Sequence, residues 1–185
     1  MECWIRRATE FPDAILSPLI YWARRPTRIW SSGGKFTIFT PFVRSRTCFD
    51  RVTEVDTVTG CAILVSANVW TALGGFDPKY SMYFEDFDLT LRAKNKGIRT
   101  YVLPDGELHV LHHVSGSFRG AGPWRRHYFM LTSSLIFIRS HYQGIRKSIC
   151  FVLSCAHLAM TTFLSLPELP KPKLLWSAVV RGLSE

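Results

Sequence analysis

Three acidic residues, Glu85, Asp86 and Asp88, lie within four positions of one another in the sequence. A positioned carboxylate can act as a general base that takes the proton of an attacking hydroxyl group. Neighbouring carboxylates raise one another's proton affinity by like-charge repulsion, which favours that role. The alternative is structural, because acids in the first turn of a helix stabilise the positive end of its dipole. Asp88 precedes Arg92 by four residues, the spacing of a helical ion pair, so we expect it to stay ionised.

A second candidate for chemistry is the set of three histidines His109, His112 and His113. A neutral imidazole can bind a divalent metal ion. Histidines in a loop are also ordinary surface residues, and the sequence pattern leaves both interpretations open.

Regular elements must position these residues. Residues 55–65 are apolar and β-branched and predict a strand with Gly60 in its middle. We expect Ser66 to cap a short helix over 67–73 that ends at Gly74 and Gly75. The acids then begin a helix over 85–96.

The flanking sequence predicts further elements. These are a buried strand over 12–21, a loop over 24–34, a turn at Gly33 and Gly34, an edge strand over 35–43 interrupted by Pro41, a strand over 98–103, a turn at 104–106 and an amphipathic helix over 123–142.

Residues 148–166 contain no Asp, Glu, Lys or Arg, and they are just long enough to cross a bilayer. Polar residues recur in this segment at helical spacing, namely Ser154, His157, Thr161 and Ser165. We therefore favour a helix that lies in the membrane interface or packs on a partner. A membrane span and a buried core helix are the alternatives.

The composition, with 47% apolar and 20% charged residues in a chain of 185, indicates a globular protein with a core. The net charge is +9, and residues 109–185 carry nine basic but two acidic side chains. A basic, apolar tail favours an anionic membrane surface over nucleic acid, for which no motif is present. A solvated basic face is the alternative.

The five cysteines form no C-x-x-C pair, and no secretory signal is visible, so we expect reduced thiols in the cytosol.

The run from Val55 to Arg92 reads VDTVTGCAILVSANVWTALGGFDPKYSMYFEDFDLTLR. It resembles the glycosyltransferase family 2 pattern: a VD-x-x-x-G-(A/C) strand, a short helix, G-G-F-D, an aromatic loop and E-D-x-D-L-x-x-R. Pro104-Asp105 and the stretch from His112 to Ser117 continue the resemblance, as do PDAILSPLI and RIWSSGGKF upstream, so that it covers about residues 12–140.

The resemblance implies an α/β fold, a partial GT-A mixed sheet, followed by C-terminal amphipathic, membrane-associated helices. We expect a truncated GT-A domain at 1–142, the acceptor half, and a basic, apolar helical tail at 143–185. The family's nucleotide-binding half, which ends in a D-x-D metal motif, is expected to be missing or to come from a partner chain.

The resemblance also implies roles for individual residues. Asp86 is the expected catalytic base, and His112 the expected metal ligand, with His109 as an alternative. A divalent metal, Mg²⁺ or Mn²⁺, is expected only if the D-x-D half is supplied. The expected substrate-binding residues are Gly60, Cys61, Asp77, Glu85 and Asp88, although packing also explains Gly60 and turn capping also explains Asp77.

Three further positions have two interpretations each. Trp30 and Tyr83 could stack on a sugar ring or belong to the core. Ser133 and Ser134 stand where family members often carry an Arg-Asn pair; if that arginine holds the diphosphate, its loss agrees with a chain that does not bind one.

The function implied is an inverting transfer of a hexose or deoxyhexose from a nucleotide-sugar donor to a glycan or lipid-linked acceptor, in cell-surface polysaccharide synthesis. We expect the transfer to take place in the cytoplasm, at the inner face of the cell membrane, and we expect no nucleic-acid partner. We also expect this chain to be a fragment that is inactive alone. The alternative is a non-catalytic, membrane-associated interaction module derived from such an enzyme.

Overall fold

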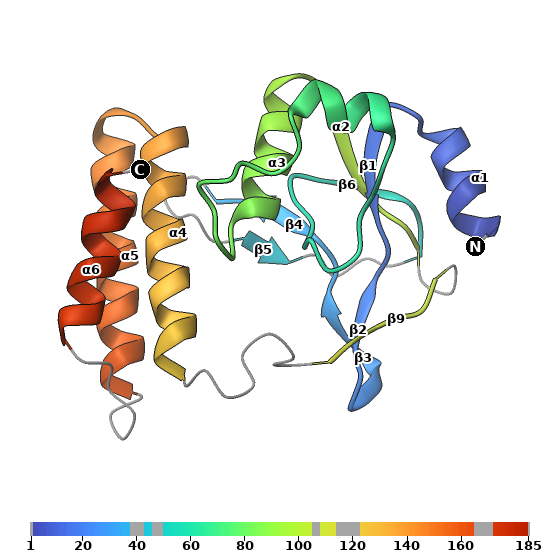
Figure 1. Cartoon of the computed structure of the whole chain (residues 1–185). Coiled ribbons are helices and arrows are strands. Elements are labelled where there is room, and N and C mark those ends of the chain that lie inside the picture. Colours follow the sequence, from blue (N-terminus) through green and yellow to red (C-terminus); the bar gives the residue numbers. More distant parts are fainter. Residues whose placement is uncertain are drawn as a thin grey trace. The chain divides into compact units, whose positions relative to one another are not determined.

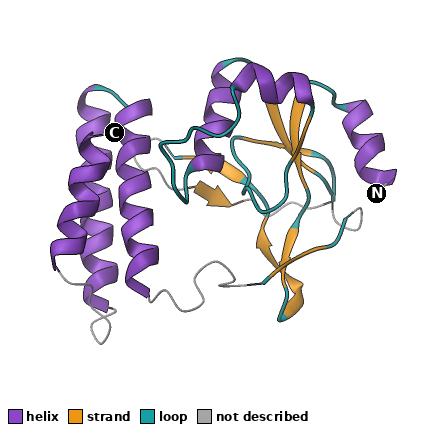
Figure 2. Cartoon of the chain, viewed as in Figure 1, coloured by secondary structure: helices purple, strands orange, loops and turns teal. Residues whose placement is uncertain are grey.

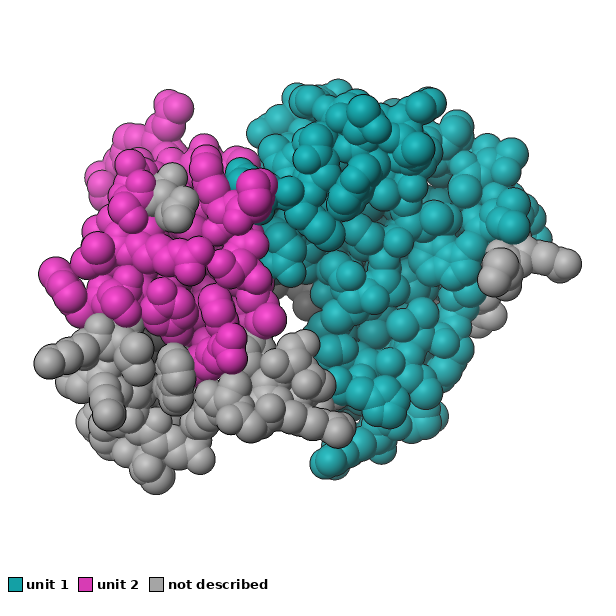
Figure 3. Space-filling model, viewed as in Figure 1, with its two compact units in different colours: residues 1–36, 43–77, 85–114 teal, residues 37–42, 78–84, 115–185 magenta. Residues whose placement is uncertain are grey.

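The computed structural model describes residues 2–37, 43–45, 50–104, 108–113, 123–164 and 172–184. Figure 1 shows a mixed α/β chain whose helices and strands are distinguished in Figure 2, which confirms the predicted fold class. The chain forms two compact units, coloured separately in Figure 3. Unit 1 is Met1–Phe36, Val43–Asp77 and Glu85–Val114, and unit 2 is Thr37–Phe42, Pro78–Phe84 and Ser115–Glu185. The predicted domains at 1–142 and 143–185 stay a prediction.

Unit 1 is built on a mixed four-stranded sheet in the order β6-β8-β1-β7, which are Thr53–Val55, Arg99–Val102, Ala14–Ser17 and Leu64–Val65. The central strand β1 pairs in parallel with β8 and antiparallel with β7. All four residues of β1 are buried, as expected for a strand covered on both faces.

Two smaller sheets complete unit 1. One has the order β3-β2-β9, which are Arg25–Ser31, Ile20–Trp22 and Val110–His112, and the other pairs β4 with β5, Gly34–Phe36 and Val43–Ser45. The predicted loop over 24–34 is therefore wrong, because most of it is strand β3. Pro26 lies within β3, and a proline is tolerated there because β3 lies at the edge of its sheet.

Two strand predictions are wrong in extent. The run 12–21 is two strands in different sheets, β1 and β2, with Pro18 between them, since proline lacks the N–H that a continuous ladder needs. The run 55–65 is strand only at its ends, in β6 and β7. Between them, Asp56 and Thr57 exchange backbone hydrogen bonds with Gly34, so the chain leaves the sheet, and Gly60 lies in a turn.

The helices of unit 1 agree with the sequence pattern where one was recognised. Helix α2, Ala67–Leu73, begins at Ser66, whose side chain accepts a hydrogen bond from the Val69 amide, and ends at Gly74 in the left-handed conformation. Helix α3 spans Glu85–Asn95. The N-terminal helix α1, Glu2–Glu10, was not predicted. Helices α2 and α3 cover the sheet through a core that includes Ile15, Leu19, Val69, Leu89 and Ala93.

Unit 2 contains three helices: α4, Pro123–His141; α5, Gly144–Leu164; and α6, Pro172–Ser184. Both α5 and α6 pack on α4 (Figure 1). Leu131 and Leu135 of α4 form a buried cluster with Ala178 of α6. Within the described residues, none of the helices is long and apolar enough to cross a membrane.

Some sequence predictions fall wholly or partly on residues outside the described ranges. These are the edge strand at 38–42 with Pro41, the turn at Asp105 and Gly106, the segment Ser115–Ser117, Cys48, the side chains of Cys3, His157 and Thr161, and residues 165 and 166 of the apolar tail.

Candidate functional site

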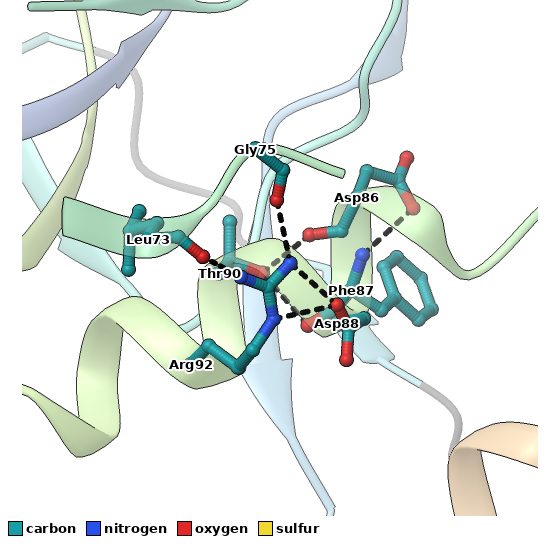
Figure 4. Close-up of polar contacts among 7 residues, drawn as sticks. All are labelled: Leu73, Gly75, Asp86, Phe87, Asp88, Thr90 and Arg92. Atoms are coloured by element: carbon teal, nitrogen blue, oxygen red, sulfur yellow. Dashed lines mark hydrogen bonds and ion pairs between the residues drawn. The ribbon is translucent and has the colours of Figure 1, made fainter. Parts of the chain in front are cut away.

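Asp86 lies in the first turn of α3, and its carboxylate is held by the main chain. The Gly60 amide donates to Oδ2 at 2.8 Å and the Phe87 amide donates to Oδ1 at 2.8 Å. The Thr59 side chain adds a further hydrogen bond. Figure 4 shows Asp86 beside Phe87 at the start of the helix. Both carboxylate oxygens are thereby fixed in direction, which a general base requires.

The loop that carries Gly60 is tied to the same helix. Thr90 of α3 donates through its hydroxyl to Thr57 Oγ1 at 2.8 Å, and also contacts the Asp86 carbonyl at 2.8 Å. A Cβ atom added at Gly60 would lie 3.5 Å from Asp86 Cβ, an ordinary contact distance. Gly60 therefore serves the site through its amide, and sterics do not demand a glycine here.

Burial, rather than a neighbouring charge, is the main cause that raises the pKa of Asp86, and the hydrogen bonds from Gly60, Phe87 and Thr59 oppose it. The sequence interpretation had the direction right but attributed it to like-charge repulsion. Repulsion does contribute at Glu85. Burial is the largest cause that raises the pKa of Glu85, and the charge of Asp86 raises it further. Both carboxyl groups are therefore more basic than in a free side chain.

Glu85 has an unsatisfied atom. Its Oε2 is buried and has no hydrogen-bond partner in the structure. A buried carboxylate oxygen without a donor is costly, and such an atom is a place where a ligand hydroxyl could donate.

The backbone immediately before Glu85 is strained. Tyr83 and Phe84 both have φ of 66°, in the left-handed region that bulky side chains rarely adopt. Each such residue costs on the order of 1–3 kcal/mol, and such strain is concentrated at functional sites. Strain here is consistent with a turn that must deliver Glu85 and Asp86 in one orientation.

Asp88 faces away from this arrangement. It is 2% exposed, and Arg92 binds its Oδ2 through Nε at 2.7 Å and Nη2 at 2.6 Å. The expected ion pair is therefore present. Arg92 also donates to the carbonyls of Leu73 and Gly75, as Figure 4 shows. The pair thus fastens α3 to the end of α2, and the role of Asp88 in binding substrate stays a prediction.

Asp77 follows the Gly74-Gly75-Phe76 turn and is partly buried. The turn is packed through Phe76, whose ring meets Trp70 edge-on with centroids 5.2 Å apart. The predicted contact of Asp77 with substrate also stays a prediction.

Cys61 follows Gly60 in the chain, and Gly60 is the residue whose amide holds Asp86. Cys61 Sγ is 3.7 Å from His112 Nδ1. The His112 ring stacks on Trp30 with centroids 3.8 Å apart and an angle of 14°. The structure therefore brings together Asp86, Gly60, Cys61 and His112, and Trp30 joins them as an aromatic neighbour.

His112, rather than His109, adjoins this cluster, since the His109 ring stacks on Tyr21. Burial, with the charge of His113 as a second cause, lowers the pKa of His112, which favours the neutral imidazole. Over the described ranges, no group of three or more His, Cys, Asp or Glu side chains could hold a metal ion. The described residues therefore do not by themselves fit a divalent metal.

The sequence pattern did not predict the structural role of the buried residue Asp56. Asp56 is 8% exposed and accepts hydrogen bonds from Lys94 Nζ at 2.7 Å and the Phe36 amide at 3.0 Å. Burial alone would raise the pKa of Asp56, but Lys94, Phe36 and Lys35 together lower it. The Val55-Asp56 pair belongs to the family pattern, but no local signal indicates that Asp56 pairs with Lys94, 38 residues later. Thr59 was missed because a threonine before a glycine has no distinctive signal.

Comparison with known proteins places these residues in a family. A model of the family described as "Glycosyltransferase like family 2" matches residues 23–124, more than half of the chain. The chain belongs to glycosyltransferase family 2. The resemblance expected from the sequence is thereby confirmed, and all seven predicted site residues lie in the matched part of this family 2 chain.

Two rhamnosyltransferases are similar to the family 2 chain. "Rhamnosyltransferase WbbL" of Escherichia coli (strain K12) is 39% identical over 67 residues, which are 36% of this chain and 25% of that protein. "N-acetylglucosaminyl-diphospho-decaprenol L-rhamnosyltransferase" of Mycobacterium tuberculosis (strain ATCC 25618 / H37Rv) is 30% identical over 131 residues, 71% of this chain and 37% of that protein. The alignments thus span well under half the length of these relatives. No solved structure matches significantly.

Proposed function

We propose that this chain provides the acceptor side of an inverting sugar transfer from a nucleotide-sugar donor to a glycan or lipid-linked acceptor, in cell-surface polysaccharide synthesis. The observation that carries the proposal is the Asp86 carboxylate, held by the amides of Gly60 and Phe87 and made more basic by burial. Family membership supports the reaction class. The names of both relatives support rhamnose, a deoxyhexose, as the sugar, and the name of the mycobacterial relative specifies L-rhamnose.

In this mechanism, Asp86 accepts the proton of the acceptor hydroxyl as its oxygen bonds to the anomeric carbon of the sugar. The bond from that carbon to the diphosphate breaks at the same time, and the nucleoside diphosphate leaves with the electron pair. Attack from the face opposite the leaving group inverts the anomeric configuration. The amides of Gly60 and Phe87 fix the carboxylate, so little reorganisation is needed at the moment of transfer.

Glu85 supplements this base as an acceptor-binding residue. Its buried Oε2 without a partner is suited to accept a hydrogen bond from a second hydroxyl of the acceptor sugar. Cys61, and the face formed by His112 and Trp30, would border the bound sugar on the side of the Gly60 turn.

The donor-binding part of the proposed enzyme lies outside this arrangement. In keeping with the resemblance, we propose that a nucleotide-binding half with a D-x-D motif, and the Mg²⁺ or Mn²⁺ that it holds, come from a further segment or a partner chain. His112 would be the contribution of this chain to such a metal. The relative that acts, by its name, on a diphospho-decaprenol substrate supports a lipid-linked acceptor and a location at the inner face of the cell membrane.

Replacing Asp86 with asparagine tests the proposal. Sugar transfer by the natural protein, measured as labelled sugar incorporated from the nucleotide donor, should fall about 10²–10⁴-fold. In the wild type, transfer should decline as the pH falls through the raised pKa of Asp86, because only the carboxylate accepts a proton. Asp13→Asn, which alters an exposed acid of the same unit, is the matched control and should leave transfer unchanged. Wild-type transfer by Asp86→Asn would contradict the role of Asp86 as the base. No transfer by the wild-type protein would favour the non-catalytic interaction module.

A further inference from the structure

Helix α6 has two different faces. The face toward α4 is made of small residues: Ala178 is fully buried, and a Cβ atom added at Gly182 would lie 2.8 Å from Leu135 Cβ. The opposite face carries Trp176, Val180 and Leu183, which follow helical spacing and are 70%, 49% and 45% exposed. These three large apolar side chains of α6 thus point away from the cluster around Ala178, against which Val179 packs.

Helix α5 repeats this arrangement. Its inner face includes Cys150 and Ser154, which are buried against the unit. Ile145, Val152 and Leu153 are exposed, and their spacing places them on one side of the helix. Exposed aliphatic and tryptophan side chains on consecutive helices are unusual for a surface that faces only water.

The three helices of unit 2 carry basic side chains. Residues 123–164 and 172–184 contain seven arginines and lysines and no aspartate or glutamate. Arg125, Arg126, Arg139 and Lys147 are among the exposed ones. Apolar side chains with tryptophan beside basic residues are the combination that binds an anionic lipid surface, where apolar groups enter the headgroup region and cations contact the phosphates.

We propose that the exposed faces of α5 and α6 dock on an anionic lipid bilayer, with Trp176, Val180 and Ile145 inserted among the headgroups. The helices lie on the membrane and do not cross it. The proposal draws on the described residues of unit 2 alone and does not require the transferase function.

The docking helix is also joined to the loop that leads to Asp86. Arg181 of α6 donates through Nη2 to Ser81 Oγ at 2.9 Å. Ser81 lies in the segment Pro78–Phe84 of unit 2, which runs directly into α3. The helix proposed to contact the bilayer therefore also holds the segment Pro78–Phe84, which precedes the candidate base in the chain.

Vesicle co-sedimentation tests the proposal with the natural protein and defined lipids. The protein should sediment with vesicles of phosphatidylcholine and phosphatidylglycerol, and far less with phosphatidylcholine alone or in high salt, since each basic residue at an anionic surface contributes about fivefold in binding. The double variant Trp176→Ser with Val180→Ser should lose at least about tenfold in partitioning. Ile5→Ser is the matched control, because Ile5 is 63% exposed on α1 of unit 1, and it should bind as the wild type does.

Three outcomes would overturn the proposal. The first is that the wild-type protein does not bind the vesicles. The second is that the double variant binds them as strongly as the wild type does. The third is that the wild type forms a dimer in sedimentation analysis and the double variant does not, which would make this face a contact between copies. The Asp86→Asn variant separates the two proposals, since it should bind vesicles normally. No sugar transfer by the wild-type protein, together with normal vesicle binding, would refute the transferase proposal alone.

Discussion

Glu85 and Asp86 are adjacent, but their surroundings differ in one respect that matters for function. Asp86 has amide donors on both carboxylate oxygens, whereas Glu85 keeps a buried Oε2 without a partner. The satisfied carboxylate is fixed in place, as a base must be. A buried carboxylate oxygen without a donor is costly, and a ligand hydroxyl could supply the missing hydrogen bond. This contrast is why we assign proton transfer to Asp86 and acceptor binding to Glu85.

Replacing Glu85 with glutamine should therefore stabilise the fold at neutral pH. Burial raises the pKa of Glu85, so its favourable contribution exists below the unfolded-state pKa and is lost as the pH rises through the folded-state pKa. Removing the charge should gain about 1 kcal/mol at pH 8 and little at pH 4. Urea unfolding at the two pH values measures this, with Glu54→Gln on the exposed face of β6 as the control. Equal stabilisation at both pH values would show that burial of the charge is not the cause.

At the scale of elements, the ion pair of Asp88 and Arg92 links α3 to the turn after α2. Arg92 satisfies the buried carboxylate and the carbonyls of Leu73 and Gly75 at once. A planar guanidinium group can reach all three acceptors, whereas a lysine ammonium cannot match this geometry. The pair thus holds the Gly-Gly-Phe-Asp turn against the helix that carries Asp86.

Arg92→Met should destabilise the protein by about 3–5 kcal/mol, because it leaves Asp88 buried and unpaired. Arg92→Lys should recover only part of that loss. Lys96→Met is the comparison: Lys96 is exposed and reaches one carbonyl, that of Ala72, so the loss should stay below about 1 kcal/mol. Chemical denaturation of the three variants measures these differences, and similar stabilities for Arg92→Met and Lys96→Met would refute this role.

The elements found from the sequence are those defined by local signals. Ser66 and Gly74 end their helix through contacts within four residues, so the sequence predicts both ends correctly. The strands were harder, because pairing between distant residues decides where they stop. Asp56 and Thr57 leave the sheet by bonding to Gly34, and nothing near them in the sequence indicates it.

The candidate site was likewise predicted only in part. The family pattern identified Asp86, but the amide of Gly60 that orients it comes from 26 residues earlier. A strand glycine was expected to leave room for a ligand, whereas the structure uses its N–H. The strained turn at Tyr83 and Phe84 has no sequence signal either, since neither residue type favours a left-handed backbone.

At the scale of the whole molecule, the chain passes from unit 2 to unit 1 at the strained turn. Residues 78–84 are held within unit 2 by three contacts: Arg181 with Ser81, Ser133 Oγ with the Met82 carbonyl at 2.7 Å, and the ring of Phe84 with that of Phe137 at 5.5 Å. The serine that stands in place of the family's Arg-Asn pair therefore has a positive role. It anchors the backbone one residue before the left-handed pair.

Ser133→Ala should accordingly reduce sugar transfer more than it reduces stability. Without the hydroxyl, the turn at Tyr83 and Phe84 can relax, and Asp86 would reach the acceptor hydroxyl less often. We expect kcat to fall about tenfold, since small misplacements of a catalytic group cost on this order or more, while the free energy of unfolding falls by about 1 kcal/mol.

Ser134→Ala is the matched control for this prediction. Ser134 is also buried, but its hydroxyl donates to the Leu131 carbonyl of its own helix at 2.9 Å. Its removal should therefore leave kcat unchanged, with KM unaffected in both variants. If Ser133→Ala lowers stability but transfers sugar as the wild type does, Ser133 supports only the helix packing, and the strained turn does not depend on α4 for its geometry.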